Sequence, residues 1–429
     1  MTRALIAMLA VSVLIFSACA STGATPSAPA PSVSQAASEP AAESPSAAEP
    51  SVAAESPSEA AASPSEAASG DGASPSGEPS GSAPTTGGLA ACGNQDSGDA
   101  FKIGGVTDVG QLEDKSFNEA GWCGTIAGAT AVGGSAEVIV TEDPADYASN
   151  MQQLIDQDFD IIVTYGFALG NATSIAAKEN PEVKFIGLDQ GVCVDANGDP
   201  DPTFACEGDA AELLPNYQGL IFAEAQAGYL AGIVAAHLTE SDVIGAVGGI
   251  DTIPPVVDYI TGYENGAKSV NPDIEVLTTY VSDDITKAFN DPATGKSIGE
   301  QMIGQDADVL FQVAGLSGQG TLEAACDADI AGIGVDVDQS QSLPNLADCI
   351  ATSAEKKIKD AISNAIQRVA DGTDEAGTIM NDASADPPGV GLSPFGAAFA
   401  DKITPEVQAM LDKALEDMKA GTLDPKAAP

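Results

Sequence analysis

From about Phe101 onward, short runs rich in Val and Ile alternate with stretches that have helical spacing. Lys102–Val106 is a first predicted strand, Asn118–Val132 is the helix that follows, and Glu137–Val140 is a second strand. Strands separated by helices of ten or more residues are typical of βαβ units, in which the strands lie parallel. Because roughly 330 residues are more than one core usually covers, we expect an α/β protein with two lobes.

The alternation continues to about residue 370. Further strands are predicted at 161–165, 183–188, 243–247, 275–281, 309–313 and 332–335, and further helices at 147–157, 172–178, 224–238, 254–270, 294–304 and 356–370. We expect two Rossmann-like lobes joined by a hinge. The binding domain would cover 99–429, with lobe one at about 101–219 and 350–378 and lobe two at about 220–349 and 379–429.

The N-terminal segment has the features of an export signal. Arg3 precedes an apolar run, Ala4–Phe16, of about 13 residues, whereas a helix that spans a bilayer needs about 20. A short run behind one positive charge indicates a signal peptide, residues 1–18. The small residues before Cys19 resemble the lipobox of bacterial lipoproteins. We therefore expect a lipid on Cys19 that anchors the protein at the extracytoplasmic face of the cell membrane; ordinary secretory cleavage is the alternative.

Residues 19–98 have the composition of a linker. After Cys19 they are mostly Ala, Ser, Pro, Glu and Gly, with hardly any large apolar side chain. Such a segment cannot bury enough surface to offset its chain entropy, so we expect it to be disordered. Frequent proline and repelling glutamates favour an extended tether. A glycosylated stalk would serve the same spacing role.

Six cysteines remain beyond Cys19: Cys92, Cys123, Cys193, Cys206, Cys326 and Cys349. An even number in an exported protein indicates disulfides, although six cysteines allow 15 pairings. Cys193 and Cys206 flank a turn-rich loop, so this pair is predicted first. Cys326–Cys349 is the next pair, and Cys92–Cys123 follows by elimination.

Charge and motif content argue against several functions. The chain has 63 acidic and 16 basic residues, so nothing in it could neutralise nucleic-acid phosphates. It has no Cys-x-x-Cys pair and one histidine, His237, and the calcium-like loop 195–201 has Pro200 where an EF-hand requires glycine. Gly315–Gly320 matches neither a phosphate loop nor Gly-x-Ser-x-Gly. We expect no nucleic acid, metal, cofactor or enzymatic activity.

Polar and aromatic residues gather at the predicted strand ends. In open parallel sheets, ligands bind beyond the carboxyl ends of the strands. Aromatic faces stack on flat rings, and carboxylates accept hydrogen bonds from hydroxyl or amine groups. These residues therefore predict a site for a polar, ring-containing small molecule: Asp108, Phe117, Phe167, Asn171, Asp189, Gly315 and Asp336.

Short motifs follow one another from about Phe101 to the C-terminus: Val106–Gly110, Asp114–Asn118, Ala177–Phe185, Ala227–Gly232, Phe289–Pro292, Gly334–Gln339, Thr352–Lys356 and Gly391–Phe395. In this order they resemble the basic membrane protein family, whose members are substrate-binding lipoproteins of ABC importers, several of which bind purine nucleosides. Two features depart from the family pattern. The chain is strongly acidic, and its cysteine-bounded segment after Asp189 is expected near the mouth of the cleft.

The resemblance implies a type I periplasmic-binding-protein fold that closes on its ligand like a hinged trap. Asp108 would hydrogen-bond the edge of a purine base. Phe117 and Phe289, one from each lobe, would sandwich the base. Phe167 and Asn171 would lie in the same region.

At the other end of the ligand, the resemblance implies that Asp336 accepts hydrogen bonds from the ribose hydroxyls, with Lys356 close by. Gly315 would let the backbone approach the ligand, and Asp189 would lie in the cleft.

Several of these residues also have simpler interpretations. Asp108 and Asp336 could cap helices, as aspartate at a strand–helix junction commonly does. Phe117 and Phe289 could belong to a core. Lys356 could be a solvated helix residue.

We therefore expect a monomeric receptor that captures a purine nucleoside and delivers it to the permease and ATPase subunits of an ABC importer. The alternative is a ligand sensor of the same fold that presents its closed form to a membrane signalling partner, since both uses need the same closure. A nucleoside hydrolase is disfavoured because Asp108 has no adjacent acid with which to share a metal.

Overall fold

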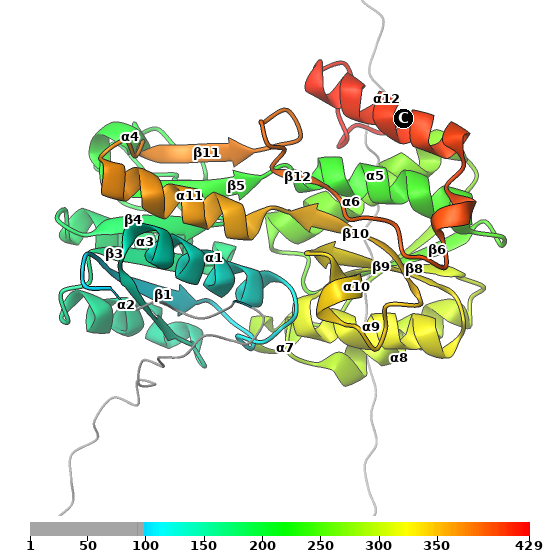
Figure 1. Cartoon of the computed structure of the whole chain (residues 1–429), viewed down its shortest axis with the longest axis horizontal. Helices are drawn as coiled ribbons and strands as arrows, with labels where there is room; N and C mark the ends of the chain where they lie inside the picture. Colours follow the sequence, from blue (N-terminus) through cyan, green and yellow to red (C-terminus); the bar gives the residue numbers. More distant parts are fainter. Residues whose placement is uncertain (1–91, 93–97) are drawn as a thin grey trace, which may run out of the picture. The chain divides into compact units, whose positions relative to one another are not determined.

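The computed structural model describes Cys92 and residues 98–429 (Figure 1). The predicted signal peptide, Cys19 and nearly all of the predicted linker lie outside the described residues. Within 98–429, the strands form two six-stranded sheets, each with its own helices. The predicted α/β fold with two lobes joined by a hinge is confirmed.

Lobe one is built on the first sheet, in which all paired strands are parallel. Helices α1 and α11 pack against each other although about 230 residues separate them. In spatial order the strands are β11 (Gly377–Asn381), β5 (Tyr217–Phe222), β4 (Lys184–Leu188), β3 (Ile161–Tyr165), β1 (Lys102–Thr107) and β2 (Ser135–Ile139). The helices are α1 (Phe117–Val132), α2 (Tyr147–Ile155), α3 (Gly170–Glu179), α4 (Ala210–Leu213) and α11 (Ile358–Asp371), with 3-10 turns η2 (Pro144–Asp146) and η3 (Phe167–Leu169).

Lobe two is built on the second sheet, which is parallel except for the antiparallel pairing of β12 with β10. Its strands, in spatial order, are β12 (Val390–Leu392), β10 (Ile350–Lys356), β9 (Ala331–Asp336), β8 (Val309–Val313), β6 (Val243–Gly248) and β7 (Glu275–Tyr280). The helices are α5 (Glu224–Leu238), α6 (Pro254–Val270), α7 (Ile285–Ala288), α8 (Pro292–Ile303), α9 (Gly315–Asp327), α10 (Gln339–Ser342) and α12 (Pro405–Lys419), with the 3-10 turn η4 (Ala400–Lys402).

The described chain passes between the lobes after β5, after β10 and after β11. The prediction that residues 350–356 belong to lobe one is wrong, because β10 pairs with β9 and β12 of the second sheet. The other two crossings lie about three residues later than predicted, since β5 and β11 complete the first sheet before the chain leaves it.

The burial of the central strands explains why their positions could be predicted from the sequence. Every residue of β3 and β8 is buried, and most residues of both strands are apolar: Ile, Val and Tyr in β3, and Val, Leu and Phe in β8. Parallel strands covered by helices on both faces favour such continuous apolar runs. The edge strand β7, in contrast, has exposed and half-buried residues throughout.

All three predicted disulfides are present. Cys92–Cys123 joins the start of the described chain to α1, Cys193–Cys206 closes a loop between β4 and β5, and Cys326–Cys349 joins the end of α9 to the segment before β10.

None of the helices in the described residues combines the length and the apolar character that a membrane span requires.

Candidate ligand-binding site

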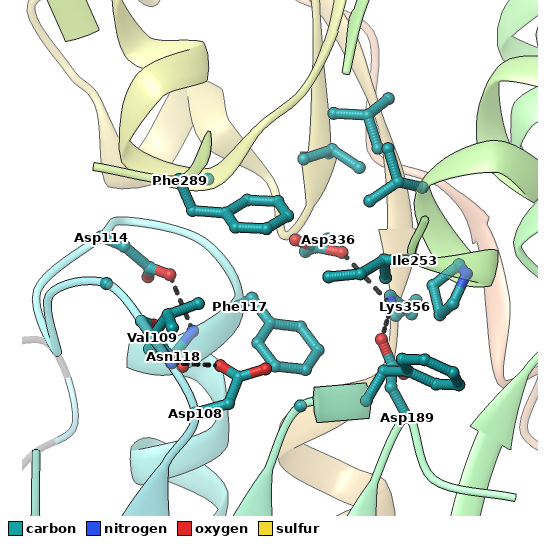
Figure 2. A pocket seen from close by; sticks show the side chains of 18 of the residues that line it. Asp108, Val109, Asp114, Phe117, Asn118, Asp189, Ile253, Phe289, Asp336 and Lys356 are labelled. Carbon is teal, nitrogen blue, oxygen red and sulfur yellow. Dashed lines mark hydrogen bonds and ion pairs between the residues drawn. The ribbon is translucent and has the colours of Figure 1, made fainter. Parts of the chain in front are cut away.

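A cavity lies between the lobes, where the carboxyl ends of strands from both sheets meet (Figure 2). Its empty volume, with the open space at the mouth included, is about 650 Å³. Lobe one contributes Asp108, Val109, Gly110, Asp114, Phe117, Asn118, Gly166, Phe167 and Asp189. Lobe two contributes Ile253, Pro255, Val256, Tyr259, Phe289, Val313, Gly315, Val335, Asp336 and Lys356. A molecule in this cavity would contact both lobes.

Two phenylalanine rings face the cavity from opposite lobes. Phe117 is the first residue of α1, and Phe289 directly follows α7. Figure 2 shows the two rings on opposite sides of the cavity. Gly249 lies just after β6 and leaves room for the Phe289 ring. A Cβ at this position would collide with the ring. Opposed aromatic faces of this kind can hold a flat ring between them.

Lys356, the last residue of β10, places a buried cation in the site. Its Nζ lies 2.5 Å from Asp189 Oδ2, 3.3 Å from Glu224 Oε1 and 3.8 Å from Asp336 Oδ1. The same nitrogen lies 5.0 Å from the centroid of the Phe117 ring, within cation–π range. Lys356 therefore links Asp189 of lobe one with Asp336 of lobe two.

The protonation equilibria of this cluster reflect burial and mutual attraction. Burial alone would lower the pKa of Lys356, but the carboxylates of Asp189, Glu224 and Asp336 raise it above its ordinary value. Burial raises the pKa of Glu224 to about 8 despite the nearby ammonium group. It also raises the pKa of Asp189 and of Asp336. Because three acidic groups share one cation, the cluster favours hydrogen-bond donors and disfavours anions.

Asp114 supports the helix that carries Phe117. Its carboxylate accepts hydrogen bonds from the backbone N–H groups of Ser116, Asn118 and Glu119 at 2.9, 2.9 and 3.1 Å. These amides have no partners within α1, since the first turn of a helix leaves its N–H groups free. Burial nevertheless raises the pKa of Asp114 to about 7.

Asp108 lies directly after β1, on the Phe117 side of the cavity in Figure 2. Its Oδ1 accepts a hydrogen bond of 2.6 Å from the backbone N–H of Val109. Burial raises the pKa of Asp108 to about 7, and the charge of Asp189 adds to this shift. Gly166 is required beside it, because a Cβ there would collide with the Asp108 carboxylate. Asp108 is thus held at the cavity wall and tends to bind a proton near neutral pH.

Two oxygen atoms of cavity-lining residues are buried without a hydrogen-bond partner among the described residues: Asn118 Oδ1 and Asp189 Oδ1. The Asn118 amide is oriented by its Nδ2, which donates to the backbone oxygen of Val109 at 2.9 Å. Buried polar atoms in folded proteins nearly always have partners. A ligand that donates hydrogen bonds would therefore be favoured here.

Asp189 and Asp336 adopt left-handed backbone conformations, with φ of 57° and 64°. Such conformations cost about 1–3 kcal/mol outside glycine and cluster at functional sites. The interpretation of Asp336 as a helix cap is wrong, because Asp338 caps α10 by accepting from the backbone N–H of Ser340. Asp108 is not a cap either, since the helix that follows it begins only at Phe117.

The segment 114–116 of lobe one is hydrogen-bonded to lobe two beside the cavity. Gln319 Nε2 of α9 donates to the backbone oxygen of Asp114 at 2.9 Å, and Ser342 Oγ of α10 donates to that of Lys115 at 2.9 Å. Ser116 Oγ donates to Asp336 Oδ2 at 2.8 Å. These bonds connect the two lobes directly.

Residues 101–418 match the family model described as ABC transporter substrate-binding protein PnrA-like, the Bmp family. The chain belongs to this family. It is 28% identical over 317 residues to the ABC transporter nucleoside-binding protein BmpA of Lactococcus lactis subsp. cremoris, covering 68% of this chain and 83% of that protein. It is 30% identical over 258 residues to basic membrane protein A of Borreliella burgdorferi, covering 59% and 68% of the two chains.

The fold of this Bmp-family protein also resembles solved structures. An ABC transporter solute-binding protein from Aeropyrum pernix K1 matches with a TM-score of 0.64 and 23% identity, over 77% of this chain and 94% of the other. This likeness confirms the predicted periplasmic-binding-protein fold. The family resemblance stated from the motifs is likewise confirmed.

The structure brings most of the predicted site residues of the Bmp-family protein to the cavity: Asp108, Phe117, Phe167, Asp189, Phe289, Gly315, Asp336 and Lys356. It does not bring Asn171 there. Asn171 is exposed, because α3 buries the face formed by Thr173, Ser174 and Ala177. Lys356 is a buried strand residue, so its interpretation as a solvated helix residue is wrong.

Gly315 contributes through its backbone conformation. Its φ is 52°, and a Cβ there would make only ordinary contacts, the nearest at 3.6 Å from Phe289. The requirement for glycine at this position thus comes from the left-handed backbone.

Other site residues were not predicted. The segment after β6 and the start of α6 contribute Ile253, Pro255, Val256 and Tyr259. The signal that could have identified them is that this segment follows the carboxyl end of a strand. Glu224 carries no such signal, because it reaches Lys356 from the start of α5 through tertiary structure alone.

Among the described residues, no group of three or more His, Cys, Asp or Glu side chains is placed to hold a metal ion. In the calcium-like loop, the Asp195 carboxylate accepts from the backbone N–H groups of Asn197 and Asp199 at 2.7 and 3.0 Å, so it serves the loop's own turns.

Proposed function

We propose that this protein captures a purine nucleoside outside the cell and delivers it to the permease and ATPase subunits of an ABC importer. The observation that carries the proposal is the pair of rings, Phe117 and Phe289, that face one cavity from opposite lobes. A planar base between them would contact both lobes and favour closure. Base–aromatic stacking contributes about 1–3 kcal/mol per base.

The polar groups of the cavity match a neutral ligand with several hydrogen-bond donors. Asp108 lies on the Phe117 side and would accept from the edge of the base. Asp336, Asp189 and Lys356 lie together at the opposite end and would bind the ribose hydroxyls. Lys356 Nζ is already shared among three acidic groups, so it is not free to pair with a phosphate, which any ionised acid of the cluster would repel. The ligand is therefore a nucleoside and not a nucleotide.

The comparisons support the same class of ligand. The Lactococcus relative is named a nucleoside-binding protein, and the family model is described as that of ABC transporter substrate-binding proteins. The lipid predicted on Cys19 and the linker predicted at 20–98 would keep such a receptor near its permease.

Calorimetric titration of the full chain with adenosine, guanosine and inosine tests the proposal. At least one of them should bind, and the matching 5′-monophosphate should bind at least tenfold more weakly. Ribose alone and cytidine are the controls for the sugar and for the size of the base. A folded sample that gives neither heat nor thermal stabilisation with any purine nucleoside would refute the proposal.

A further inference from the structure

The connection between β4 and β5 departs from the usual form. These neighbouring strands are parallel, and such strands are generally joined by a crossover that contains a helix. Here residues 189–216 contain only the four-residue helix α4. The disulfide Cys193–Cys206 closes a loop within this connection, which we call the disulfide loop (193–206).

Internal bonds give the disulfide loop a defined shape. The Asp201 carboxylate, which is nearly buried, accepts from the backbone N–H groups of Thr203 and Cys206, both at 2.9 Å. On its outer side, Asp199 Oδ1 lies 2.5 Å from Lys178 Nζ of α3. The loop is thus fixed both to itself and to the body of lobe one.

Phe204, near the end of this loop, lies against a residue of the cavity. Its ring stacks on the Phe167 ring with a centroid distance of 6.4 Å and an angle of 12° between the planes. Phe167 lines the cavity and is half-buried. The disulfide loop therefore reaches the ligand site through this ring contact.

The exposure of Phe204 is unusual for this molecule. Its side chain is 66% exposed, more than any other large hydrophobic residue with an exposed side chain in the described part of the chain. Its φ of 54° is also in the left-handed region, which a bulky residue rarely adopts. A strained and exposed aromatic residue beside a binding cavity points to a role in binding.

We propose that Phe204 is a positioning residue of the ligand site, which holds the Phe167 ring in its orientation toward the cavity and shields the mouth. This proposal rests on the proposed function for the identity of the ligand. Stacked rings restrict each other's tilt, so removal of Phe204 frees Phe167 to turn away from the bound molecule. The disulfide holds Phe204 at this place, which gives the disulfide loop a part in ligand retention.

The experiment compares the full chain with its Phe204→Ala, Phe204→Tyr and Met410→Ala variants. Stopped-flow and calorimetric measurements with inosine give the association rate, the dissociation rate and Kd. An aromatic pair contributes enough to change Kd by about 2- to 12-fold. We expect Phe204→Ala to raise Kd by this factor, mainly through faster dissociation. Phe204→Tyr keeps the ring and should restore the wild-type rate, and Met410→Ala, exposed on α12, should have no effect.

A second measurement does not depend on the ligand. In protein labelled with 4-fluorophenylalanine, the ¹⁹F resonance of Phe167, assigned with Phe167→Leu, should shift in Phe204→Ala. The Cys193→Ser/Cys206→Ser double variant should shift it in the same direction. If wild type binds a nucleoside and Phe204→Ala leaves both the dissociation rate and the resonance unchanged, the positioning role is refuted alone. If wild type binds no nucleoside, the proposed function fails, and an unchanged resonance would then overturn the positioning role as well.

Discussion

Ser116 of lobe one donates a 2.8 Å hydrogen bond to the Asp336 carboxylate of lobe two, while Lys356 Nζ lies 3.8 Å from the other oxygen of the same carboxylate. One acidic side chain therefore joins the contact between the lobes to the charged cluster of the cavity. We expect a ligand bound to Asp336 to favour closure, because Ser116 of the other lobe donates to the same carboxylate.

Replacement of Ser116 by alanine should weaken closure. The lost hydrogen bond to a charged group is worth about 1.5 kcal/mol, which corresponds to roughly a tenfold rise in Kd. Small-angle scattering should show a larger radius of gyration for the ligand-free variant. Ser149→Ala, at an exposed site on α2, is the matched control. An unchanged radius and an unchanged Kd would contradict the coupling.

Phe117→Leu and Phe289→Leu should each weaken nucleoside binding by about 1–3 kcal/mol, the range for base–aromatic stacking. Calorimetry with inosine measures the loss. Leucine keeps most of the apolar volume, so thermal unfolding should change little. Equal affinity in both variants and in wild type would mean that no base lies between the rings.

Gly249→Ala should act through Phe289. The added methyl group would collide with the Phe289 ring and displace it from the cavity wall. We expect an affinity loss comparable to that of Phe289→Ala. The Gly249→Ala/Phe289→Ala double variant should bind no worse than Phe289→Ala alone, because contacting residues are not additive. Additive losses would show that Gly249 acts by another route.

Lys356→Met should destabilise the protein by about 3–5 kcal/mol, as expected when one partner of a buried ion pair is removed. Burial already raises the pKa of Glu224 to about 8 with Lys356 present. The unpaired acids therefore bind protons at low pH, and the loss should be smaller at pH 5 than at pH 8. Urea unfolding at both pH values measures this, with Lys419→Met, at an exposed site, as control. The Lys356→Met/Glu224→Gln double variant should be more stable at pH 8 than Lys356→Met alone.

Asp108→Asn should change how stability depends on pH. Burial raises the pKa of Asp108 from 3.8 to about 7, so the folded state binds the proton more tightly than the unfolded state. The resulting stabilisation is complete below pH 3.8 and is lost as the pH rises to about 7. Asp108→Asn should flatten this part of the profile, although Asp114 retains its own contribution. Thermal unfolding between pH 4 and pH 8 measures the slope, and exposed Asp401→Asn should leave it unchanged.

The sequence predicted the elements whose burial matches their composition. Residues 254–270 were predicted as a helix that begins with proline, and this helix is α6. Strands β3 and β8 were predicted from their mostly apolar residues. Helix α9 (Gly315–Asp327) was not among the predicted helices, and glycine disfavours helix formation. Gly318 and Gly320 are there for packing: a Cβ at either position would collide with Gln312 or with the backbone of Pro292. Helix propensity depends on nearby residues in the sequence, so it cannot predict these contacts with Gln312 and Pro292.

The site was predictable where it lies in contiguous motifs and unpredictable where it depends on tertiary contacts. Asp108 directly follows β1, Phe117 begins the next helix and Asp336 ends β9, so their positions could be inferred from the chain. Glu224 reaches Lys356 from the first turn of α5, and nothing local marks it. The stacking of Phe204 on Phe167 likewise joins two loops that are unrelated in sequence.

The strand order determines when each sheet can be completed during synthesis of the chain. β5 gains its outer neighbour β11 only when residue 381 has emerged, and β10 gains β12 only at residue 392. A nascent chain therefore cannot finish its first lobe before most of its second has been made. In an interrupted chain that stops before residue 377, β5 and β10 would be edge strands without their outer partners β11 and β12, and unpaired edges are templates for aggregation.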